Sequence, residues 1–263
     1  MSNKQSIGVF DSGIGGLSIW KEIITLLPNE NTIYLADSKN APYGQKSKKK
    51  IIELCIKNTE LLLEKNCKLI VIACNTATTN AIKYLRSNYN IPFIGIEPAI
   101  KPAALKTKTN SIGILATKGT LTSELFNSTS QKFSDGITII EQIGEGLVPL
   151  IESGNIDSFE MDNLLRKYLN PMLEKNIDYL VLGCSHYPFL ITQIRKIIND
   201  KVTIIDSGEA VAKQTLSILK LHELLNNNNF KSQHELYSNS DITTMQQIVN
   251  NLQNNYLIKK LDF

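Results

Sequence analysis

The stretch from Leu69 to Ala77 reads Leu-Ile-Val-Ile-Ala-Cys-Asn-Thr-Ala. It opens with a short apolar run rich in β-branched residues, which is typical of a buried strand in a parallel sheet. Cys74 and Asn75 end the run, and apolar residues at helical spacing follow them. The stretch therefore predicts a strand that passes directly into a helix, with a thiol at the junction.

The same pattern returns later in the chain. Residues 179–184 read Tyr-Leu-Val-Leu-Gly-Cys, 110 positions after residues 69–74. Two further pairs of segments resemble each other at similar offsets, namely 7–10 with 112–115 and 91–99 with 202–210. Three similar offsets favour two related α/β halves.

Short β-branched runs alternate with longer helical patterns along the whole chain, as expected of α/β units around a mainly parallel sheet. The predicted strands are residues 7–10, 32–36, 69–73, 93–96, 111–115, 137–142, 179–182 and 202–205. The predicted helices are residues 17–27, 47–65, 76–89, 120–133, 157–175, 188–198 and 208–225. We expect the fold class α/β, with residues 1–97 plus 207–263 as the first domain and 98–206 as the second. The last helices then return to the first domain, and residues 226–229 form a solvated turn.

The composition is that of a globular protein. The chain has 263 residues, of which 42% are apolar and 20% charged, so disordered, collagen-like and coiled-coil classes are excluded. Its 28 basic and 25 acidic residues give a net charge of only +3, and scattered acidic residues balance the Lys-rich stretch 46–50. Without a large basic surface we expect no nucleic-acid partner.

The apolar runs and the N-terminal residues indicate where the protein resides. The apolar runs are far shorter than the roughly 20 residues of a membrane-spanning helix, so we expect no membrane insertion. A predicted strand begins at Ile7, which leaves no room for the apolar segment of a signal peptide. We expect a cytoplasmic protein with reduced thiols and, since no C-x-x-C pair is present, neither a disulfide framework nor a metal site.

The four cysteines differ in their surroundings. Cys55 lies on the apolar face of a predicted helix and Cys67 just before a strand, so both are expected to pack as small hydrophobic residues. Cys74 and Cys184 follow equivalent predicted strands, beyond which ligands bind in open α/β sheets. A helix N-terminus at each thiol would favour the thiolate, and His186 could tune the second thiol. If the halves face one another, so do these thiols.

A Gly-rich turn follows the first predicted strand. Residues 11–16 read Asp-Ser-Gly-Ile-Gly-Gly and lack both the Rossmann and the P-loop fingerprint, and Asp11 would repel a phosphate. We expect Asp11 to supply a carboxylate while Ser12 and glycine amides contact an anion; a tight strand-to-helix connection is the alternative. The turn at 41–44 closes over a small ligand or is purely conformational. With only three Arg in the chain, a bound anion must rely mostly on amides and hydroxyls.

Four motifs, in order and spacing, resemble those of glutamate racemases of the aspartate/glutamate racemase superfamily over nearly the whole chain. They are Phe10-Asp11-Ser12-Gly13-Ile14-Gly15-Gly16, Pro42-Tyr43-Gly44, Ala73-Cys74-Asn75-Thr76-Ala77 and Leu182-Gly183-Cys184-Ser185-His186-Tyr187-Pro188. The resemblance implies two pseudo-symmetric α/β domains with the active site in the cleft between them. It also implies a homodimer that interconverts L- and D-glutamate without cofactor or metal, for peptidoglycan synthesis and hence cell-wall biogenesis.

The resemblance also implies residue roles. Cys74 and Cys184 are the implied acid–base pair, which fits an inversion that needs a base on one face of a carbon and an acid on the other. Asp11 is implied to assist Cys74, and Glu152 and His186 to assist Cys184. The implied substrate contacts are Asp11, Ser12, Tyr43, Gly44, Asn75, Thr76, Thr117, Ser185 and His186.

Two positions depart from the family pattern, and two other functions stay open. Ser185 replaces the usual Thr but keeps its hydroxyl, and Ala99 replaces a frequent Gly. The alternatives are a racemase for aspartate or another acidic amino acid, and a non-catalytic module that binds small anions on the same fold. Retention of every implied catalytic residue argues against the second.

Overall fold

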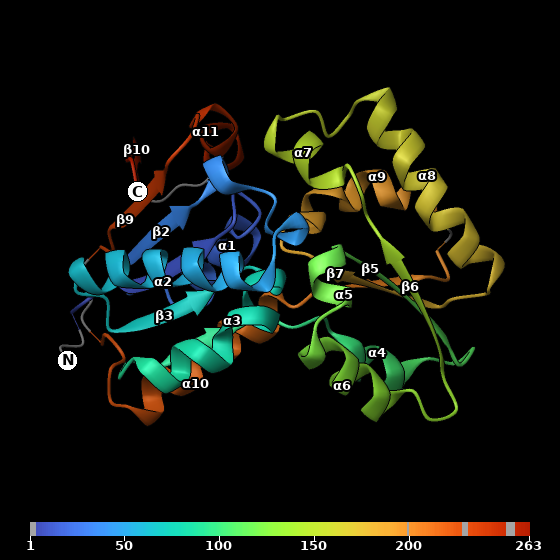
Figure 1. Cartoon of the computed structure of the whole chain (residues 1–263), viewed down its shortest axis with the longest axis horizontal. Coiled ribbons are helices and arrows are strands. Elements are labelled where there is room, and N and C mark those ends of the chain that lie inside the picture. The colour runs from blue at the N-terminus through green and yellow to red at the C-terminus, as the bar shows by residue number, and fades with distance from the viewer. Residues whose placement is uncertain (1–3, 199, 228–230, 251–255) are drawn as a thin grey trace.

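Two parallel sheets organise the chain (Figure 1). The structure is a computed structural model that describes residues 4–198, 200–227, 231–250 and 256–263. The first sheet contains β1 (Ile7–Asp11), β2 (Thr32–Ala36), β3 (Leu69–Ile72), β4 (Phe93–Gly95), β9 (His234–Ser238) and β10 (Tyr256–Lys260). The second contains β5 (Ser111–Ala116), β6 (Thr138–Ile143), β7 (Tyr179–Gly183) and β8 (Thr203–Ile205). All these strands pair in parallel, which confirms the predicted α/β class.

Helices surround each sheet, the first half of the molecule lying at the left of Figure 1 and the second at the right. The first half contains α1 (Leu17–Leu26), α2 (Lys48–Glu64), α3 (Asn75–Asn88), α10 (Gly208–Leu221) and α11 (Thr243–Val249). The second contains α4 (Ile100–Lys106), α5 (Lys118–Leu121), α6 (Glu124–Phe133), α7 (Leu147–Glu152), α8 (Phe159–Glu174) and α9 (Ile191–Arg195). Short 3₁₀ turns cover Ser38–Asn40, Tyr43–Gln45 and Tyr187–Leu190.

The two halves repeat one topology. The strand order is β2-β1-β3-β4 in the first half and β6-β5-β7-β8 in the second, which agrees with the repeat in the sequence. Cys74 and Cys184 follow β3 and β7, which hold equivalent places in the two sheets. We propose that the domain boundaries fall at 97/98 and 206/207, where the chain passes between the sheets.

The apolar core lies on both faces of the first sheet, which explains why short apolar runs form its central strands. Val71 of β3 packs in a cluster with α1 and α10, whereas Ile70 and Ile72 pack with α2 and α3 on the opposite face. Each strand therefore buries both faces, as expected of a parallel sheet covered by helices. The α1 and α10 cluster continues into the second half, where it includes Leu165 of α8 and Ile194 of α9.

The C-terminal segment contains strands as well as the helices expected there. β9 and β10 extend the first sheet beyond β2, and β9 alternates fully buried with partly exposed residues. Its sequence, His-Glu-Leu-Tyr-Ser, is short and polar, so it lacks the apolar run by which the other strands were found. Of the turn expected at 226–229, residues 228 and 229 lie outside the described residues.

Several helix predictions were wrong in detail. The helix expected at 120–133 is divided into α5 and α6, because the Ser123 side chain accepts a hydrogen bond from Phe126 N and starts a new helix. The helix expected at 188–198 begins as the 3₁₀ turn Tyr187–Leu190 and ends at Arg195. α4 and α7 were missed because runs of seven and six residues are too short to show helical periodicity.

A buried ion pair fixes the amino-terminal end of β3. Lys68 Nζ lies 2.6 Å from Glu30 Oε2, with both side chains almost fully buried. Lys68 also donates to the Leu224 carbonyl at 2.8 Å, and the Asn226 amide donates to Glu30 Oε1 at 2.7 Å. Burial lowers the pKa of Lys68, and the contact with Glu30 opposes this. The pair ties the segment that follows α10 to the first sheet.

We expect Lys68→Met to lower the free energy of unfolding by about 3–5 kcal/mol, because the Glu30 carboxylate would stay buried without its counter-charge. Urea denaturation followed by circular dichroism measures the change. Lys68→Met/Glu30→Gln should regain part of the loss, since the second change removes the stranded charge. A loss of less than about 1 kcal/mol in the single variant, typical of surface pairs, would contradict the role of this pair.

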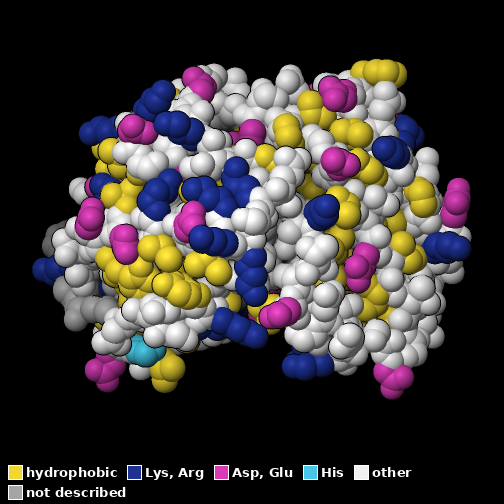
Figure 2. Space-filling model, viewed as in Figure 1, with side chains coloured by type: hydrophobic (Ala, Val, Ile, Leu, Met, Phe, Trp, Pro, Cys, Tyr) yellow, Lys and Arg dark blue, Asp and Glu magenta, His cyan; other side chains and the backbone are white. Residues whose placement is uncertain are grey.

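The surface carries both signs of charge. Lys and Arg side chains on the face drawn in Figure 2 are interspersed with Asp and Glu, and the Lys-rich stretch includes Lys48, which lies 3.9 Å from Glu124. Within the described ranges, no helix combines the length and apolar character that crossing a bilayer requires.

Candidate active site

Residues at the carboxyl ends of four strands line one space between the halves, here called the inner cavity. Ser12 follows β1, Cys74 follows β3, Thr117 follows β5 and Cys184 follows β7. The other lining residues of the cavity are Pro42, Tyr43, Gly44, Asn75, Thr76, Val148, Ser185 and His186. Since each half supplies two of the four strand ends, neither half contains the site alone.

Cys74 lies at the helix N-terminus that the sequence predicted. It is the N-cap residue of α3, and its Sγ accepts a hydrogen bond from Ala77 N at 3.4 Å. The thiol also donates to Ser12 Oγ at 3.7 Å. Burial raises the pKa of Cys74 well above its usual value, and the charges of Asp11 and Cys184 add to this, while the contacts with Ala77 and Ser12 oppose it. This environment favours the protonated thiol.

Asp11 is fully buried behind the inner cavity rather than in its lining. Its Oδ2 accepts hydrogen bonds from Gly13 N at 3.1 Å and Gly16 N at 3.0 Å, and its Oδ1 from Ser185 Oγ at 3.1 Å. The expectation that these glycine amides contact a bound anion was therefore wrong, because the protein's own carboxylate occupies them. Burial raises the pKa of Asp11, while His186 and the two amides oppose this.

Cys184 differs from Cys74 in its partner. The segment after it forms a 3₁₀ turn, not the helix expected at the thiol, and His186 occupies that place. His186 Nδ1 lies 3.8 Å from Cys184 Sγ, and its Nε2 lies 2.6 Å from Glu152 Oε1. Burial alone would lower the pKa of His186, but Cys184, Glu152 and Asp11 together raise it well above its usual value. The imidazole thus links the thiol to a carboxylate.

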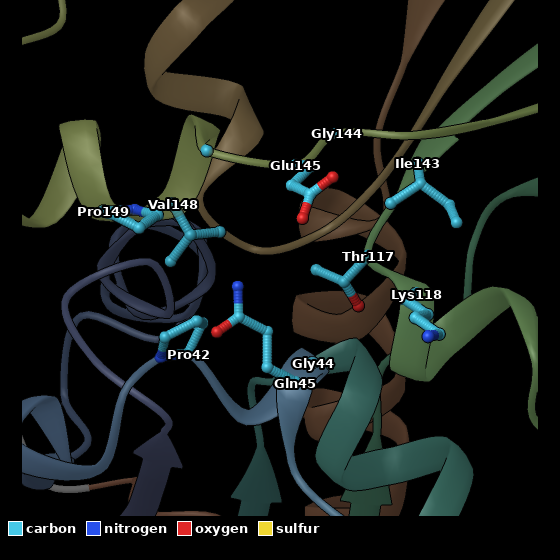
Figure 3. Close-up of a pocket in the computed structure, with 11 residues that line it drawn as sticks. Pro42, Gly44, Gln45, Thr117, Lys118, Ile143, Gly144, Glu145, Val148 and Pro149 are labelled. Carbon is cyan, nitrogen blue, oxygen red and sulfur yellow. The ribbon is translucent and has the colours of Figure 1, made fainter.

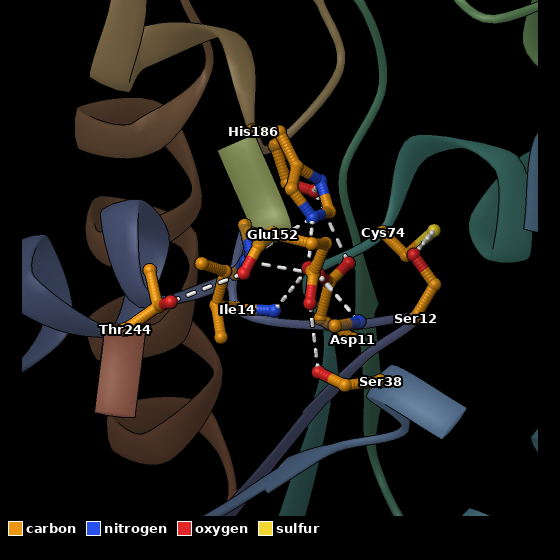
Figure 4. Close-up of polar contacts among 12 residues, drawn as sticks. Asp11, Ser12, Ile14, Ser38, Cys74, Glu152, His186 and Thr244 are labelled. Carbon is orange, nitrogen blue, oxygen red and sulfur yellow. Dashed lines mark hydrogen bonds and ion pairs between the residues drawn. The ribbon is translucent and has the colours of Figure 1, made fainter. Parts of the chain in front are cut away.

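Glu152, which the resemblance implied to assist Cys184, is largely buried at the end of α7 (Figure 4). Its carboxylate accepts from Ile14 N at 2.7 Å and from Ser38 Oγ at 2.9 Å. Burial favours the neutral acid, but His186, Ile14 and Ser38 outweigh it, so that the pKa of Glu152 is lowered. Glu152 is therefore held as a carboxylate.

The glycines of residues 11–16 allow this close approach. A Cβ atom at Gly13 would lie 1.9 Å from Glu152 Oε1, and one at Gly15 would lie 2.1 Å from His186 Nδ1. The Gly-rich turn is thus required by packing across the two halves, a function that neither interpretation of the sequence anticipated.

Tyr43 and Gly44 come from the turn that the sequence suggested could close over a ligand. The Tyr43 hydroxyl donates to the Asp37 carboxylate and accepts from Asn58 Nδ2 at 3.1 Å. Burial and the Asp37 charge raise the pKa of Tyr43 well above its usual value. Because its hydroxyl is engaged behind the cavity, Tyr43 contributes its ring and backbone to the lining.

Asn75 and three threonines provide uncharged polar groups. Both Asn75 side-chain atoms, Oδ1 and Nδ2, are buried without a hydrogen-bond partner, which is the state expected of a group that awaits a polar ligand. Thr76 Oγ1 lies 2.7 Å from Thr117 Oγ1 and 3.2 Å from Thr120 Oγ1, so these hydroxyls connect α3 to the second half.

A larger outer cavity adjoins the inner one (Figure 3). It shares Pro42, Gly44, Thr117 and Val148 with the inner cavity, and Gln45 points into it. The remaining lining residues are Lys118, Ile143, Gly144, Glu145, Gly146 and Pro149. Pro42, Gly44, Thr117 and Val148 therefore form the border between the two cavities.

The lining of the inner cavity, as described, contains neither Lys nor Arg. Arg86 donates to the Phe93 carbonyl and Arg195 to the Val202 carbonyl, and Arg166 pairs with an acid on its own helix. In the described ranges no three His, Cys, Asp or Glu side chains are grouped as a metal site would require. An anion in this cavity would be bound by hydroxyls, amides and the His186 ring.

The remaining cysteines lie in the core, as expected. Cys55 belongs to α2 and packs with the cluster under α2 and α3, and Cys67 packs in the same cluster. Burial raises the pKa of Cys67 to about 12 and that of Cys55 still further, so both stay thiols. Their predicted packing role is confirmed.

Sequence reasoning missed Ser38, Val148 and Thr120. Ser38 comes two residues after β2, so the rule that function gathers beyond strand ends would have indicated it. Val148 belongs to the missed helix α7, and Thr120 was expected only as the first residue of a helix. No sequence signal links either of them to the cavity.

The chain belongs to the Asp/Glu/Hydantoin racemase family, whose sequence pattern matches residues 7–215. Its many glutamate racemase relatives make it an amino-acid racemase, an isomerase. A glutamate racemase of Clostridium perfringens is 43% identical over 254 residues, which cover 96% of this chain and 93% of that protein.

Two solved structures share the whole fold. The glutamate racemase of Escherichia coli, in complex with L-glutamate and the activator UDP-MurNAc-ala, has a TM-score of 0.85 at 31% identity and covers 98% of both chains. That of Francisella tularensis, in complex with D-glutamate, has a TM-score of 0.83 at 30% identity and covers 99% of both.

Proposed function

We propose that the protein is a glutamate racemase that interconverts L- and D-glutamate by a cofactor-independent, two-cysteine mechanism. The observation that carries the proposal is the pair of thiols, Cys74 and Cys184, which follow equivalent strands of two repeated halves and line one cavity. The substrate class is supported by relatives and structural neighbours that are glutamate racemases, two of them in complex with glutamate.

The reaction is a proton exchange at Cα. A thiolate on one face takes the Cα proton, so that the C–H bond breaks and an S–H bond forms. The thiol on the other face then gives its proton to the carbanion, and the configuration is inverted. The two thiols exchange protonation states in each turnover, so their titration belongs to the coupled pair.

The two thiols have different proton partners. On the first side, burial and then the charge of Asp11 raise the pKa of Cys74 and favour the thiol. On the second, His186 contacts Cys184 Sγ and is itself held by Glu152. We infer that the resting enzyme carries a thiol at Cys74, and that the protonated imidazole of His186 assists proton transfer at Cys184 through its contact with Sγ.

The substrate carboxylates would be held by neutral donors. Asn75 presents an amide without a protein partner, and Ser12, Thr76 and Thr117 present hydroxyls at the cavity. Such donors also stabilise the negative charge that develops as the Cα proton leaves.

We further propose that the protein acts in the cytoplasm as a homodimer and supplies D-glutamate for peptidoglycan. The proposal follows from the family resemblance. Light scattering coupled to size-exclusion chromatography tests the dimer: a molar mass of about one chain at micromolar concentration would refute it. The role in peptidoglycan synthesis is tested by deleting the gene: growth of the cells should then depend on added D-glutamate.

Purified protein free of added cofactor should convert either enantiomer of glutamate to the racemate and incorporate solvent deuterium at Cα. Chiral chromatography and proton NMR measure the two effects. Aspartate and other acidic amino acids form the comparison panel. Faster exchange with aspartate would establish the alternative substrate, and binding of glutamate without exchange would indicate a non-catalytic module.

A further inference from the structure

Glu152 is held by atoms from the opposite half of the molecule. It ends α7 of the second half, whereas its two donors Ile14 N and Ser38 Oγ belong to segments that follow β1 and β2 of the first. His186, the third contact of the carboxylate, comes from its own half. In Figure 4, His186 lies above the Glu152 carboxylate, whereas Ser38 and Ile14 lie below it.

We propose that Ser38 is a positioning residue for proton transfer at Cys184, because its hydroxyl, with the Ile14 amide, holds the Glu152 carboxylate against His186. This proposal rests on the proposed racemase function and goes beyond it. Ser38 is outside the lining of the inner cavity and reaches Cys184 only through two other side chains.

The local structure makes Ser38 suitable for this role. It starts the 3₁₀ turn Ser38–Asn40, which is closed by the Ala41 amide donating to the Ser38 carbonyl at 3.1 Å. Asn40 Nδ2 donates to Asp37 Oδ1 at 2.8 Å and tightens the same turn. A Glu side chain has several rotatable bonds, so a hydroxyl on a fixed turn restricts which way the carboxylate points.

The charge of Glu152 depends on the same contact. The titratable groups that face it are His186, Asp11 and Tyr34. His186 favours the carboxylate, whereas the charge of Asp11 and the burial of the site disfavour it. The Ser38 hydroxyl stabilises only the charged form, so its removal raises the pKa of Glu152.

In Ser38→Ala we expect kcat to fall about tenfold, the scale of one lost hydrogen bond to a charged group, with KM unchanged. The acidic limb of the kcat profile should move to higher pH, because Glu152 then protonates more readily. Ser38→Thr keeps a hydroxyl and should restore most of kcat. The matched control is Thr244→Ala, since Thr244 Oγ1 donates at 3.1 Å to the backbone carbonyl of Glu152 and not to its carboxylate.

A second measurement separates this proposal from the proposed function. Carbon-13 NMR follows the Glu152 carboxyl, identified by the signal that Glu152→Gln removes, and needs no turnover. Its titration midpoint should rise in Ser38→Ala and stay constant in Thr244→Ala. An unchanged midpoint, or a kcat equal to the wild type, overturns the role of Ser38. An inactive wild type whose midpoint still responds to Ser38 overturns only the racemase function.

Discussion

Cys74→Ser and Cys184→Ser should each lose racemase activity by a factor on the order of 10³ or more, since general acid–base groups contribute on this scale. A hydroxyl is too weak an acid to alternate with a thiol at neutral pH, so one face of the substrate would have no working proton carrier. Racemisation is followed by polarimetry from both enantiomers. Nearly full activity in either variant would refute the assignment of two bases.

Cys67→Ala is the matched control for these substitutions. Cys67 is a buried thiol just before β3, in the cluster under α2 and α3, and it lies at the opposite end of that strand from Cys74. The variant should keep its kcat while losing some thermal stability through the small cavity it creates. If the folded Cys67→Ala variant also lost activity, then the losses in Cys74→Ser and Cys184→Ser would reflect an altered structure and not a missing acid–base group.

Gly15→Ala should reduce kcat by about 100-fold, although it adds only a methyl group. The new Cβ would lie 2.1 Å from His186 Nδ1, and a displacement of about 1 Å in a catalytic group costs on this order. Since His186 is held by Glu152, the ring cannot move without breaking that 2.6 Å contact. Steady-state kinetics measure the effect, and the folded fraction is checked by circular dichroism.

Gly208→Ala provides the comparison. Gly208 starts α10, and a Cβ there meets its nearest atoms at 3.1 Å, on the side chains of Asp206 and Glu22. We expect activity close to that of the wild type. If Gly15→Ala were equally active, then His186 would have room to shift without cost, and its contact with Glu152 would not position it for catalysis.

The sequence predicted most of the fold because the central strands are short apolar runs buried on both faces. β3 and β7 are such runs, and the repeat at Cys74 and Cys184 carried the prediction of two halves. β9 and β10 were missed because short strands with interspersed polar residues resemble loops in the sequence. The helix break at Ser123 was missed because the Ser123 hydroxyl caps a new helix, and the spacing of apolar residues gives no sign of such a cap.

For the site, the sequence indicated the residues at strand ends but not the contacts between halves. It found Cys74, Cys184 and His186, which occupy the inner cavity together. It did not foresee that glycine amides would bind Asp11, or that Ser38 would contact Glu152. Such contacts join residues more than a hundred positions apart, and no local pattern encodes their geometry.

The apolar cluster that runs from α1 and α10 into α8 and α9 has a mechanical consequence. Pulling the two halves fully apart would expose this shared core to water at roughly 25 cal/mol for each Å² of apolar surface. The two halves are therefore better described as one unit with a cavity between them than as two separate domains joined by a hinge. If substrate binds in the inner cavity, we therefore expect this apolar cluster to stay closed during turnover.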